Sequence, residues 1–287
     1  MKIKQLRAVS KSGLHLYEIC FGNPTLLIGL SGAGKSQILT CLKQIFDLVK
    51  GSEKSFLSDG RYEVKFEYDE DEYELEIQIK NDFLSTINLF RHGNLINEPA
   101  NFLRKLPDVI YLDDVSSFRH SNFIIELISK LTTKQREEII NLYKFIFSSM
   151  ESIEFEDDVL WFKERHTKSI TQKQLSDGML KTLVYVTYLI SCKPGTVLLI
   201  DEFENGLGLN CLAVLLDEIL NSYELQVILS SHHPYVINNV PQENWRIISR
   251  SKDRVIATSA EDFGIGQTRY EAFYELINLL TNGSVED

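Results

Sequence analysis

Eight residues near the start of the chain, Gly-Leu-Ser-Gly-Ala-Gly-Lys-Ser at 29–36, follow the spacing G-x-x-x-x-G-K-[ST]. The glycines leave room for backbone N–H groups to turn inward around phosphate oxygens, where a Cβ would block the approach. The lysine suits the β- and γ-phosphates of a nucleotide, and the serine hydroxyl suits Mg²⁺. The predicted phosphate contacts are Gly29, Ser31, Gly32, Ala33, Gly34, Lys35, Ser36 and Gln37, of which Ser36 is also a predicted metal ligand.

The segments on either side of this loop supply the strand and the helix that the motif needs. The apolar run Leu26-Leu27-Ile28 precedes the loop, and apolar residues recur at helical spacing from Ile38 to Val49. The loop therefore lies at the start of a helix, where the dipole and the free N–H groups attract an anion. This context disfavours the alternative interpretation, a glycine-rich turn between core elements.

Two carboxylates, Asp201 and Glu202, follow the apolar run Val197–Ile200, which is typical of a central parallel strand. Because parallel strands deliver their carboxyl ends to the ligand crevice, Asp201 is predicted to bind Mg²⁺ directly or through water. Glu202 is the candidate catalytic residue that orients and deprotonates the water attacking the γ-phosphate. Alone, the pair would be a solvated strand end, but Lys35 in the same chain favours the catalytic interpretation.

A histidine pair follows the next apolar strand, Val227–Leu229, after two serines. An isolated histidine is usually structural, but a position beside the same crevice favours a functional one. His232 is nearer to the end of the strand than His233. We therefore expect His232 to be the second catalytic residue, one that bonds the γ-phosphate or senses its presence.

The N-terminal part of the chain is predicted to be mostly strand. Lys2–Val9, His15–Cys20 and Thr25–Ile28 read as three strands of one sheet. From 61 to 96, apolar residues alternate with polar ones, which predicts an antiparallel meander with one solvated face. Its acidic cluster, Glu67 to Glu76, fits a solvated hairpin tip better than a metal site.

The middle of the chain changes period. Helical spacing between 121 and 150 predicts a short helical insert, without the heptads of a coiled-coil arm. Val159–Phe162 is predicted to be an edge strand, and the polar segment from Lys163 to Lys173 has a basic bias. That segment is a solvated edge in the simplest interpretation.

The C-terminal half is more regular. Strand, helix and strand follow one another between 197 and 229, which predicts parallel pairing with a right-handed crossover. Arg246–Ser249 and Val255–Thr258 predict a closing hairpin. The apolar stripe Tyr270, Phe273, Tyr274 and Ile277 predicts a last helix.

The composition of the chain limits the kinds of protein that it could be. The 287 residues are 44% hydrophobic and 25% charged, as in an ordinary globular chain. A net charge of −11 argues against a uniformly basic nucleic-acid surface but leaves room for a local one. The four scattered cysteines have neither disulfide-framework nor zinc spacing, and no apolar run is long enough for a signal peptide or a membrane span. We therefore expect a cytoplasmic protein without a membrane partner.

Five segments in order carry a resemblance to a known family. They resemble the ATP-binding-cassette-type ATPases of the SMC, RecF and OLD-like branch. The segments are the phosphate loop, the signature Leu175-Ser176-Asp177-Gly178-Met179, Ile200-Asp201-Glu202, Glu204 to Leu207 and Ser231-His232-His233-Pro234. The resemblance implies ATP and Mg²⁺ as cofactors and a homodimer, or a higher assembly, that sandwiches ATP. It also implies that Ser176 and Gly178 contact the γ-phosphate of ATP held by the opposite subunit, and that Glu204–Leu207 couples the two sites.

The fold that this resemblance implies is α/β, a P-loop NTPase of ABC-ATPase type with a mixed central sheet. We expect one domain over 1–287, with an antiparallel subdomain at about 55–112 and the helical insert at about 121–150. Two features depart from the family. Asp177 and Met179 replace the usual Gly and Gln of the signature, and no Gln follows the strand Val109–Leu112, where Asp113, Asp114 or Ser116 are the alternatives. Tyr17 and His15 are the candidates for contact with the base.

Three functions follow from the resemblance. The first is an ATPase subunit that gates a separate effector protein, such as a nuclease, in bacterial antiphage defence, with the stripe from Tyr270 to Ile277 as one docking candidate. That stripe more simply packs on its own sheet. The alternative is a DNA-repair or chromosome-associated ATPase that acts directly on DNA through the basic segment at 163–173. A transporter ATPase subunit fits less well, because of the signature and the meander.

Overall fold

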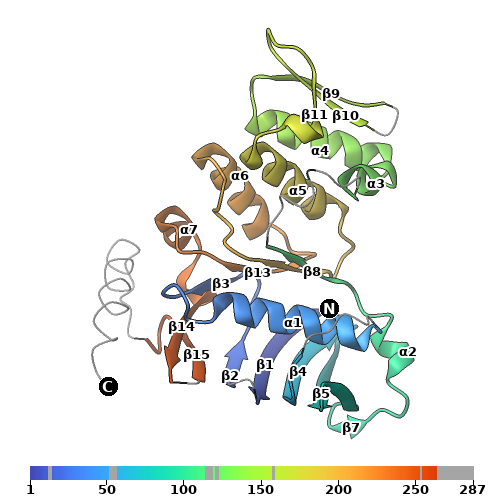
Figure 1. Ribbon diagram of the computed structural model, residues 1–287, viewed down its shortest axis with the longest axis vertical. Helices are drawn as coiled ribbons and strands as arrows, with labels where there is room; N and C mark the ends of the chain where they lie inside the picture. The colour runs from blue at the N-terminus through green and yellow to red at the C-terminus, as the bar shows by residue number, and fades with distance from the viewer. Residues whose placement is uncertain are drawn as a thin grey trace. The chain divides into compact units, whose positions relative to one another are not determined.

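The computed structural model describes residues 1–11, 15–51, 57–113, 119, 123–156, 159–252 and 254–263. The chain divides into two compact units (Figure 1). Unit 1 is Met1–Leu112, Pro194–Phe203 and Tyr223–Asp287, and unit 2 is Asp113–Lys193 and Glu204–Ser222. The single domain expected over 1–287, with its two subdomains, stays a prediction.

The described strands of unit 1 form one twelve-stranded sheet in the order β7-β6-β5-β4-β1-β2-β15-β14-β3-β13-β12-β8. The sheet is mixed, because β14, β3, β13, β12 and β8 pair in parallel at one end, whereas the β14–β15 hairpin and the strands from β2 to β7 pair antiparallel. The predicted mixed sheet is therefore confirmed. The strands are β1 (Lys2–Ser10), β2 (His15–Cys20), β3 (Thr25–Ile28), β4 (Gly60–Tyr68), β5 (Asp71–Lys80), β6 (Phe83–Arg91), β7 (Asn94–Leu95), β8 (Val109–Leu112), β12 (Val197–Ile200), β13 (Gln226–Ser230), β14 (Trp245–Ser251) and β15 (Arg254–Ser259).

The parallel strands β3, β12 and β13 lie in the core of unit 1. Every residue of β3, β12 and β13 is buried, which explains why these strands are continuous apolar runs rather than alternating ones. Helix α1 (Lys35–Val49) lies across one face of the sheet and buries the stripe from Ile38 to Val49 against it (Figure 1). This packing fixes the start of α1, and with it the phosphate loop, at the carboxyl end of β3.

The predicted meander is also confirmed. β4, β5 and β6 pair antiparallel, and buried side chains alternate with exposed or half-buried ones along β4 and β5. Asp69 and Glu70 turn β4 into β5 with positive φ angles, so the acidic cluster does surround a hairpin turn. Helix α2 (Ala100–Leu103) follows β7.

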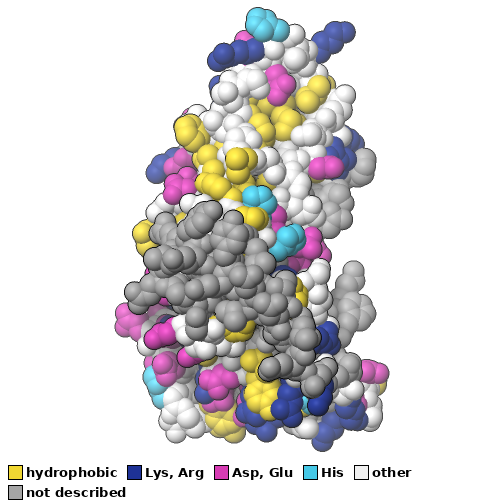
Figure 2. Space-filling view, turned by 90° about the vertical axis from the view of Figure 1, so that its left-hand side faces the viewer, with side chains coloured by type: hydrophobic (Ala, Val, Ile, Leu, Met, Phe, Trp, Pro, Cys, Tyr) yellow, Lys and Arg dark blue, Asp and Glu magenta, His cyan; other side chains and the backbone are white. Residues whose placement is uncertain are grey.

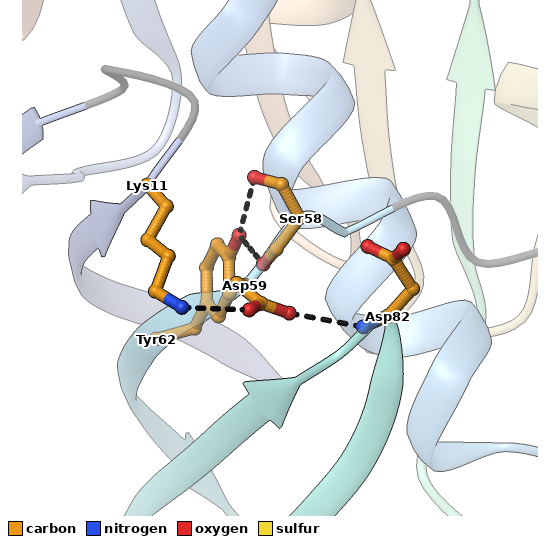
Figure 3. A network of polar contacts seen from close by, with 5 residues as sticks. All are labelled: Lys11, Ser58, Asp59, Tyr62 and Asp82. Atoms are coloured by element: carbon orange, nitrogen blue, oxygen red, sulfur yellow. Dashed lines mark hydrogen bonds and ion pairs between the residues drawn. The ribbon is translucent and has the colours of Figure 1, made fainter.

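Figure 3 shows a polar network that ties the end of β1 to the residues before β4 and to the β5–β6 turn. Lys11 Nζ donates to Asp59 Oδ2 (3.0 Å), and the backbone N–H of Asp82 donates to Asp59 Oδ1 (2.9 Å). Tyr62 OH donates to the carbonyl of Ser58 (2.7 Å). The Asp82 N–H, and then Lys11, hold the pKa of Asp59 below its usual range.

Unit 2 carries four described α-helices and a small sheet. Helix α4 begins at a capping box, in which Thr132 accepts from the N–H of Gln135 and the Gln135 side chain accepts from the N–H of Thr132. This cap starts a second helix after α3, within the helical insert predicted at 121–150. The elements are α3 (Phe123–Ser129), α4 (Thr133–Ile146), β9 (Met150–Glu156), β10 (Val159–Glu164), β11 (Ile170–Thr171), a 3₁₀ turn η2 (Gln172–Gln174), α5 (Asp177–Ser191) and α6 (Leu209–Leu220).

One strand assignment was wrong. The strand at 159–162 is not an edge strand but β10, the middle strand of the described three-stranded sheet β11-β10-β9. Its two neighbours were not predicted, because β11 is only two residues long and β9 buries only Met150 and so has no clear buried face. The burial of Leu160 and Phe162 follows from this central position.

The C-terminal elements of unit 1 are α7 (Pro234–Asn239), a 3₁₀ turn η3 (Gln242–Asn244) and the β14–β15 hairpin. The hairpin and the parallel pairing of β12 with β13 were both predicted. The predicted last helix, with the stripe from Tyr270 to Ile277, lies outside the described residues. Within the described part of the chain, we find no helix of the length and hydropathy that a membrane crossing requires.

Candidate functional site

The phosphate loop leads directly into α1. Gly34 caps the helix with a φ of 113°, a left-handed conformation that a side chain would strain. A Cβ on Gly34 would also lie 2.8 Å from a methyl group of Val255. The N-cap residue Gly34 has no side chain to cap the start of α1, so it leaves the first N–H groups of the helix to an anion.

The loop packs closely on its neighbour strand. A Cβ on Gly29 would lie 2.3 Å from the carbonyl oxygen of Ile248 on β14, so only glycine fits there. The Lys35 ammonium donates to the carbonyls of Gly29 (2.8 Å) and Leu30 (3.1 Å). The lysine is thus folded back over its own loop, within reach of a phosphate that the loop would hold.

A pocket of about 500 Å³ opens over this loop. That volume is within the range of small-ligand sites. Predicted site residues from three separate stretches of sequence line it, whereas Ala33 is buried and is not part of the lining. The predicted residues in the lining are Gly29, Ser31, Gly32, Gly34, Lys35, Ser36, Gln37, Asp201, Glu202 and His232.

The Asp201 carboxylate is held from two sides. Ser230 Oγ donates to Asp201 Oδ1 (2.5 Å), and Tyr111 OH donates to Asp201 Oδ2 (3.2 Å). Asp201 itself is buried, with 8% of its surface exposed. Two hydroxyl donors compensate for the burial of this carboxylate and fix its orientation at the end of β12.

Glu202 has an unusual backbone. Its φ is +45°, in the left-handed region that non-glycine residues rarely adopt. The Glu202 N–H donates to Ser230 Oγ (2.9 Å), and the next N–H, of Phe203, donates to the carbonyl of Ser230 (3.0 Å). A strained backbone of this kind persists only where its surroundings fix it. Here the two hydrogen bonds to Ser230 hold the backbone of Glu202 in place.

The two histidines have different surroundings. His232 is exposed and lines the pocket, at the end of β13. His233 caps α7, because its Nδ1 accepts from the N–H of Tyr235 (3.1 Å). The His233 N–H also donates to Ser231 Oγ (3.1 Å). His233 thus has a structural position, whereas His232 faces the pocket.

The donor set of the pocket fits Mg²⁺ bound with a nucleotide. Ser36 and Asp201 supply one hydroxyl and one carboxylate, and Mg²⁺ commonly takes its remaining ligands from phosphate and water. In the described residues no three His, Cys, Asp or Glu side chains gather as a metal-binding group. Ser36 and Asp201 would hold the ion together with the phosphates.

The signature segment is in unit 2 and does not line this pocket. Ser176 caps α5, its Oγ accepting from the N–H of Met179 (3.3 Å). Arg119 fixes the approach to the helix by donating to the carbonyl of Leu175 (2.5 Å) and to Asp177 Oδ1 (2.6 Å). The start of α5 therefore has a fixed shape, with the positive end of the helix dipole at Ser176 and Asp177.

The start of α5 also contacts the segment that follows Asp201-Glu202. A Cβ on Gly178 would lie 2.7 Å from the carbonyl oxygen of Gly206, so the two backbones touch. The buried Lys181 donates to the carbonyl of Asn205 (2.8 Å) and lies over the ring of Tyr185. The start of α5 and the 204–207 segment thus form one packed unit.

Four residues of the pocket lining were not predicted: Ile28, Leu30, Ile237 and Arg250. The last two belong to α7 and β14, and only the order of strands in the sheet brings them to the loop. Tyr17 and His15, the candidates for the base, are not in the lining. Asp113 is not in the lining either, and Asp114 and Ser116 lie outside the described residues.

Solved structures share this fold at low sequence identity. An SMC head bound to the C-terminal winged-helix domain of ScpA matches with a TM-score of 0.66 and 16% identity, covering 90% of this chain and 98% of that one. The SMC head domain from Thermotoga maritima matches with a TM-score of 0.59 and 16% identity, over 90% and 99% of the chains. The Smc head domain from Pyrococcus furiosus, bound to the C-terminal domain of ScpA, matches with a TM-score of 0.63 and 13% identity, covering 91% of this chain and 97% of that one.

One family model matches more than half of the chain. Comparison with curated proteins produced no match. The model described as "AAA domain, putative AbiEii toxin, Type IV TA system" matches residues 83–238, more than half of the chain, including Ser176, Asp201, Glu202 and His232 but not the phosphate loop. The chain therefore belongs to this AAA-domain family and has the α/β fold of the SMC head domains.

Proposed function

We propose that the protein binds and hydrolyses ATP. The observation that carries the proposal is a single pocket in which Lys35 and Ser36 of the phosphate loop meet Asp201, Glu202 and His232. Lys35 binds the β- and γ-phosphates, and Mg²⁺, held by Ser36 and Asp201, supplies neutralisation of phosphate charge. Glu202 orients the attacking water and takes its proton, and His232 bonds the γ-phosphate.

The active form is an ATP-sandwich homodimer, or a higher assembly built from it. Support comes from the pocket lining, whose residues all belong to unit 1 and do not include Ser176 or Gly178. Ser176 Oγ accepts the Met179 N–H, which leaves its own proton to donate to an anion. In the dimer this donor, the Gly178 N–H and the helix dipole meet the γ-phosphate bound by the partner.

The test is Glu202→Gln. Loss of the general base should abolish turnover, while ATP binding persists and the closed dimer accumulates. Light scattering with saturating ATP and Mg²⁺ measures the dimer, and phosphate release measures turnover. Lys35→Ala is the matched control, because it removes nucleotide binding itself. A Glu202→Gln variant that binds ATP but stays monomeric would refute the sandwich and leave the ATPase assignment standing.

The dimer gates a separate effector, such as a nuclease, in bacterial antiphage defence, and acts in the cytoplasm. The family description, with its putative toxin of a type IV toxin–antitoxin system, supports a role in which this chain works beside another polypeptide. Closure on ATP and reopening after hydrolysis would expose or cover the binding surface of that partner. Copurification with the product of an adjacent gene, dependent on ATP, tests this role.

A second candidate, direct action on DNA, is favoured by one surface. In the β10–β11 connection, Arg165, His166 and Lys168 are all exposed, and the neighbouring Lys163 pairs with Glu151 (3.2 Å). Basic side chains and a histidine gather at the upper end of Figure 2, the end at which β9, β10 and β11 lie in Figure 1. DNA-stimulated hydrolysis that weakens with salt, and with Arg165→Glu, supports this candidate. Turnover indifferent to DNA excludes it.

A further inference from the structure

Arg250 lies on the opposite side of the phosphate loop from the catalytic carboxylates. The sheet order around the loop is β14-β3-β13-β12, with the loop following the central β3. Asp201 and Glu202 follow β12 and His232 follows β13, all on one side of β3. Arg250 is on β14, on the other side, and lines the same pocket.

The strand register explains why Arg250 reaches the loop. β14 runs parallel to β3, with Arg246 beside Leu27 and Ile247 beside Ile28. The next residues of β14 pass the end of β3, so Ile248 packs against Gly29 and Arg250 continues alongside the loop. Arg250 is paired across the hairpin with Val255, whose side chain contacts the Gly34 position. Paired residues share a face of a sheet, so Arg250 is on the loop side.

The other two arginines of this hairpin are engaged elsewhere. Arg246 donates to the carbonyls of Cys20, Glu243 and Trp245. Arg254 lies 5.5 Å from the ring of Tyr17 and alternates with Val255, so it is on the opposite face. Arg250 is exposed, and its side chain makes no hydrogen bond or ion pair with any of the described residues.

The direction of the nucleotide follows from these positions, given the proposed function. Hydrolysis requires the γ-phosphate to face Glu202 and His232, at the ends of β12 and β13. The phosphate chain lies on the loop after β3, so the nucleoside end must extend the other way, over β14. A guanidinium is suited to that end, because it hydrogen-bonds ribose oxygens and stacks on a base.

We propose that Arg250 binds the nucleoside end of ATP, its ribose and base, and not the γ-phosphate. The inference rests on the ATPase function proposed above. It deepens that function by assigning a contact that distinguishes a nucleotide from a bare polyphosphate. Leu30, exposed at 45% and in the same lining, offers an apolar surface beside Arg250 for the base.

Arg250→Ala tests the proposal by the affinities for ATP, ADP and inorganic tripolyphosphate, measured by calorimetry. We expect ATP and ADP to weaken by the same factor, about tenfold, as one lost contact of this kind predicts. Tripolyphosphate should bind within about twofold of wild type, because it has no nucleoside. In steady-state hydrolysis, kcat/KM for ATP should fall by a similar factor, because KM should rise while kcat stays near wild type.

Arg254→Ala is the matched control, since it removes the same charge from the same hairpin on the opposite face. It should leave all three affinities within about twofold of wild type. Loss of ATP affinity alone would place Arg250 at the γ-phosphate, and equal loss for all three ligands would make it a general phosphate contact. Either result, or no loss at all, overturns the inference. A wild-type protein that binds no ATP would instead refute the proposed function.

Discussion

Ser230 Oγ donates a hydrogen bond to Asp201 Oδ1 at 2.5 Å, across the parallel strands β13 and β12. The same oxygen accepts the N–H of Glu202 at 2.9 Å. One hydroxyl therefore orients the carboxylate proposed to hold Mg²⁺ and also holds the backbone of the proposed general base in its left-handed conformation. Ser230 is fully buried, with 1% of its surface exposed, so water cannot substitute for it.

Ser230→Ala should lower kcat by about 10–100-fold, the usual effect of losing a supporting hydrogen bond at a metal ligand. The apparent affinity for Mg²⁺ should fall as well, whereas ATP binding without Mg²⁺ should stay near wild type. Tyr111→Phe is the matched comparison, because it removes only the bond to Asp201 Oδ2 and should have a smaller effect. Equal effects of the two variants, or an unchanged kcat for Ser230→Ala, would contradict this role.

Gly178→Ala should separate the signature from the 204–207 segment, because the new Cβ would lie 2.7 Å from the Gly206 carbonyl oxygen. If the sandwich dimer is the active form, hydrolysis should fall at least about tenfold while one subunit still binds ATP normally. Lys181→Met removes the neighbouring bond to the Asn205 carbonyl without a clash and should give a milder form of the same defect. Loss of ATP binding by the isolated subunit would count against this interpretation.

Leu209→Ser should weaken the ATP-dependent dimer. Leu209 is 63% exposed at the start of α6, directly after the 204–207 segment, and the Asn210 side chain ties this end to Ile146 on α4. If the proposed dimer closes beside the 204–207 segment, burial of this apolar side chain would stabilise the dimer. In a Glu202→Gln background, light scattering should show less dimer at a given ATP concentration. Tyr223→Ser, an 81% exposed residue of unit 1, should leave the dimer unchanged.

Asp59→Asn should destabilise the protein near neutral pH and have less effect in acid. The Asp82 N–H, and then Lys11, lower the pKa of folded Asp59, while an unfolded aspartate has a pKa of about 3.9. A lowered pKa stabilises the fold above the unfolded value, and the stabilisation is lost as pH falls through the folded pKa. Urea unfolding at pH 6 and near pH 3 should show the difference from wild type shrinking. A difference that is constant with pH would rule out the charged form as its source.

Much of the fold was predictable from local pattern. β3 and β12 have the bounds expected from their apolar runs, because a strand buried on both faces is apolar throughout. The bounds of β2 and β8 also match those predicted. The break before α4 follows from Thr132 and Gln135, which form a capping box. By contrast, β9 and β11 were missed, and β10 was wrongly assigned as an edge strand, because short strands leave little periodicity.

The sequence by itself determined the phosphate loop. Its strand, glycines, lysine and helix are contiguous, so Gly29 to Ser36 carry their own geometry. It also indicated that Asp201, Glu202 and His232 end two apolar strands. Each of these residues can be recognised from the few residues next to it in sequence, because each motif occupies one turn or one strand end.

Only the tertiary structure decided which other residues serve this loop. Tyr111, Ser230 and Arg250 come from β8, β13 and β14, and they reach the site because the strand order β14-β3-β13-β12-β8 places those strand ends together. The sequence of a buried apolar strand does not specify which strands pair with it, because many neighbouring strands would bury it equally well. Their positions are therefore set by long-range pairing and packing, which the spacing of residues along the chain does not record.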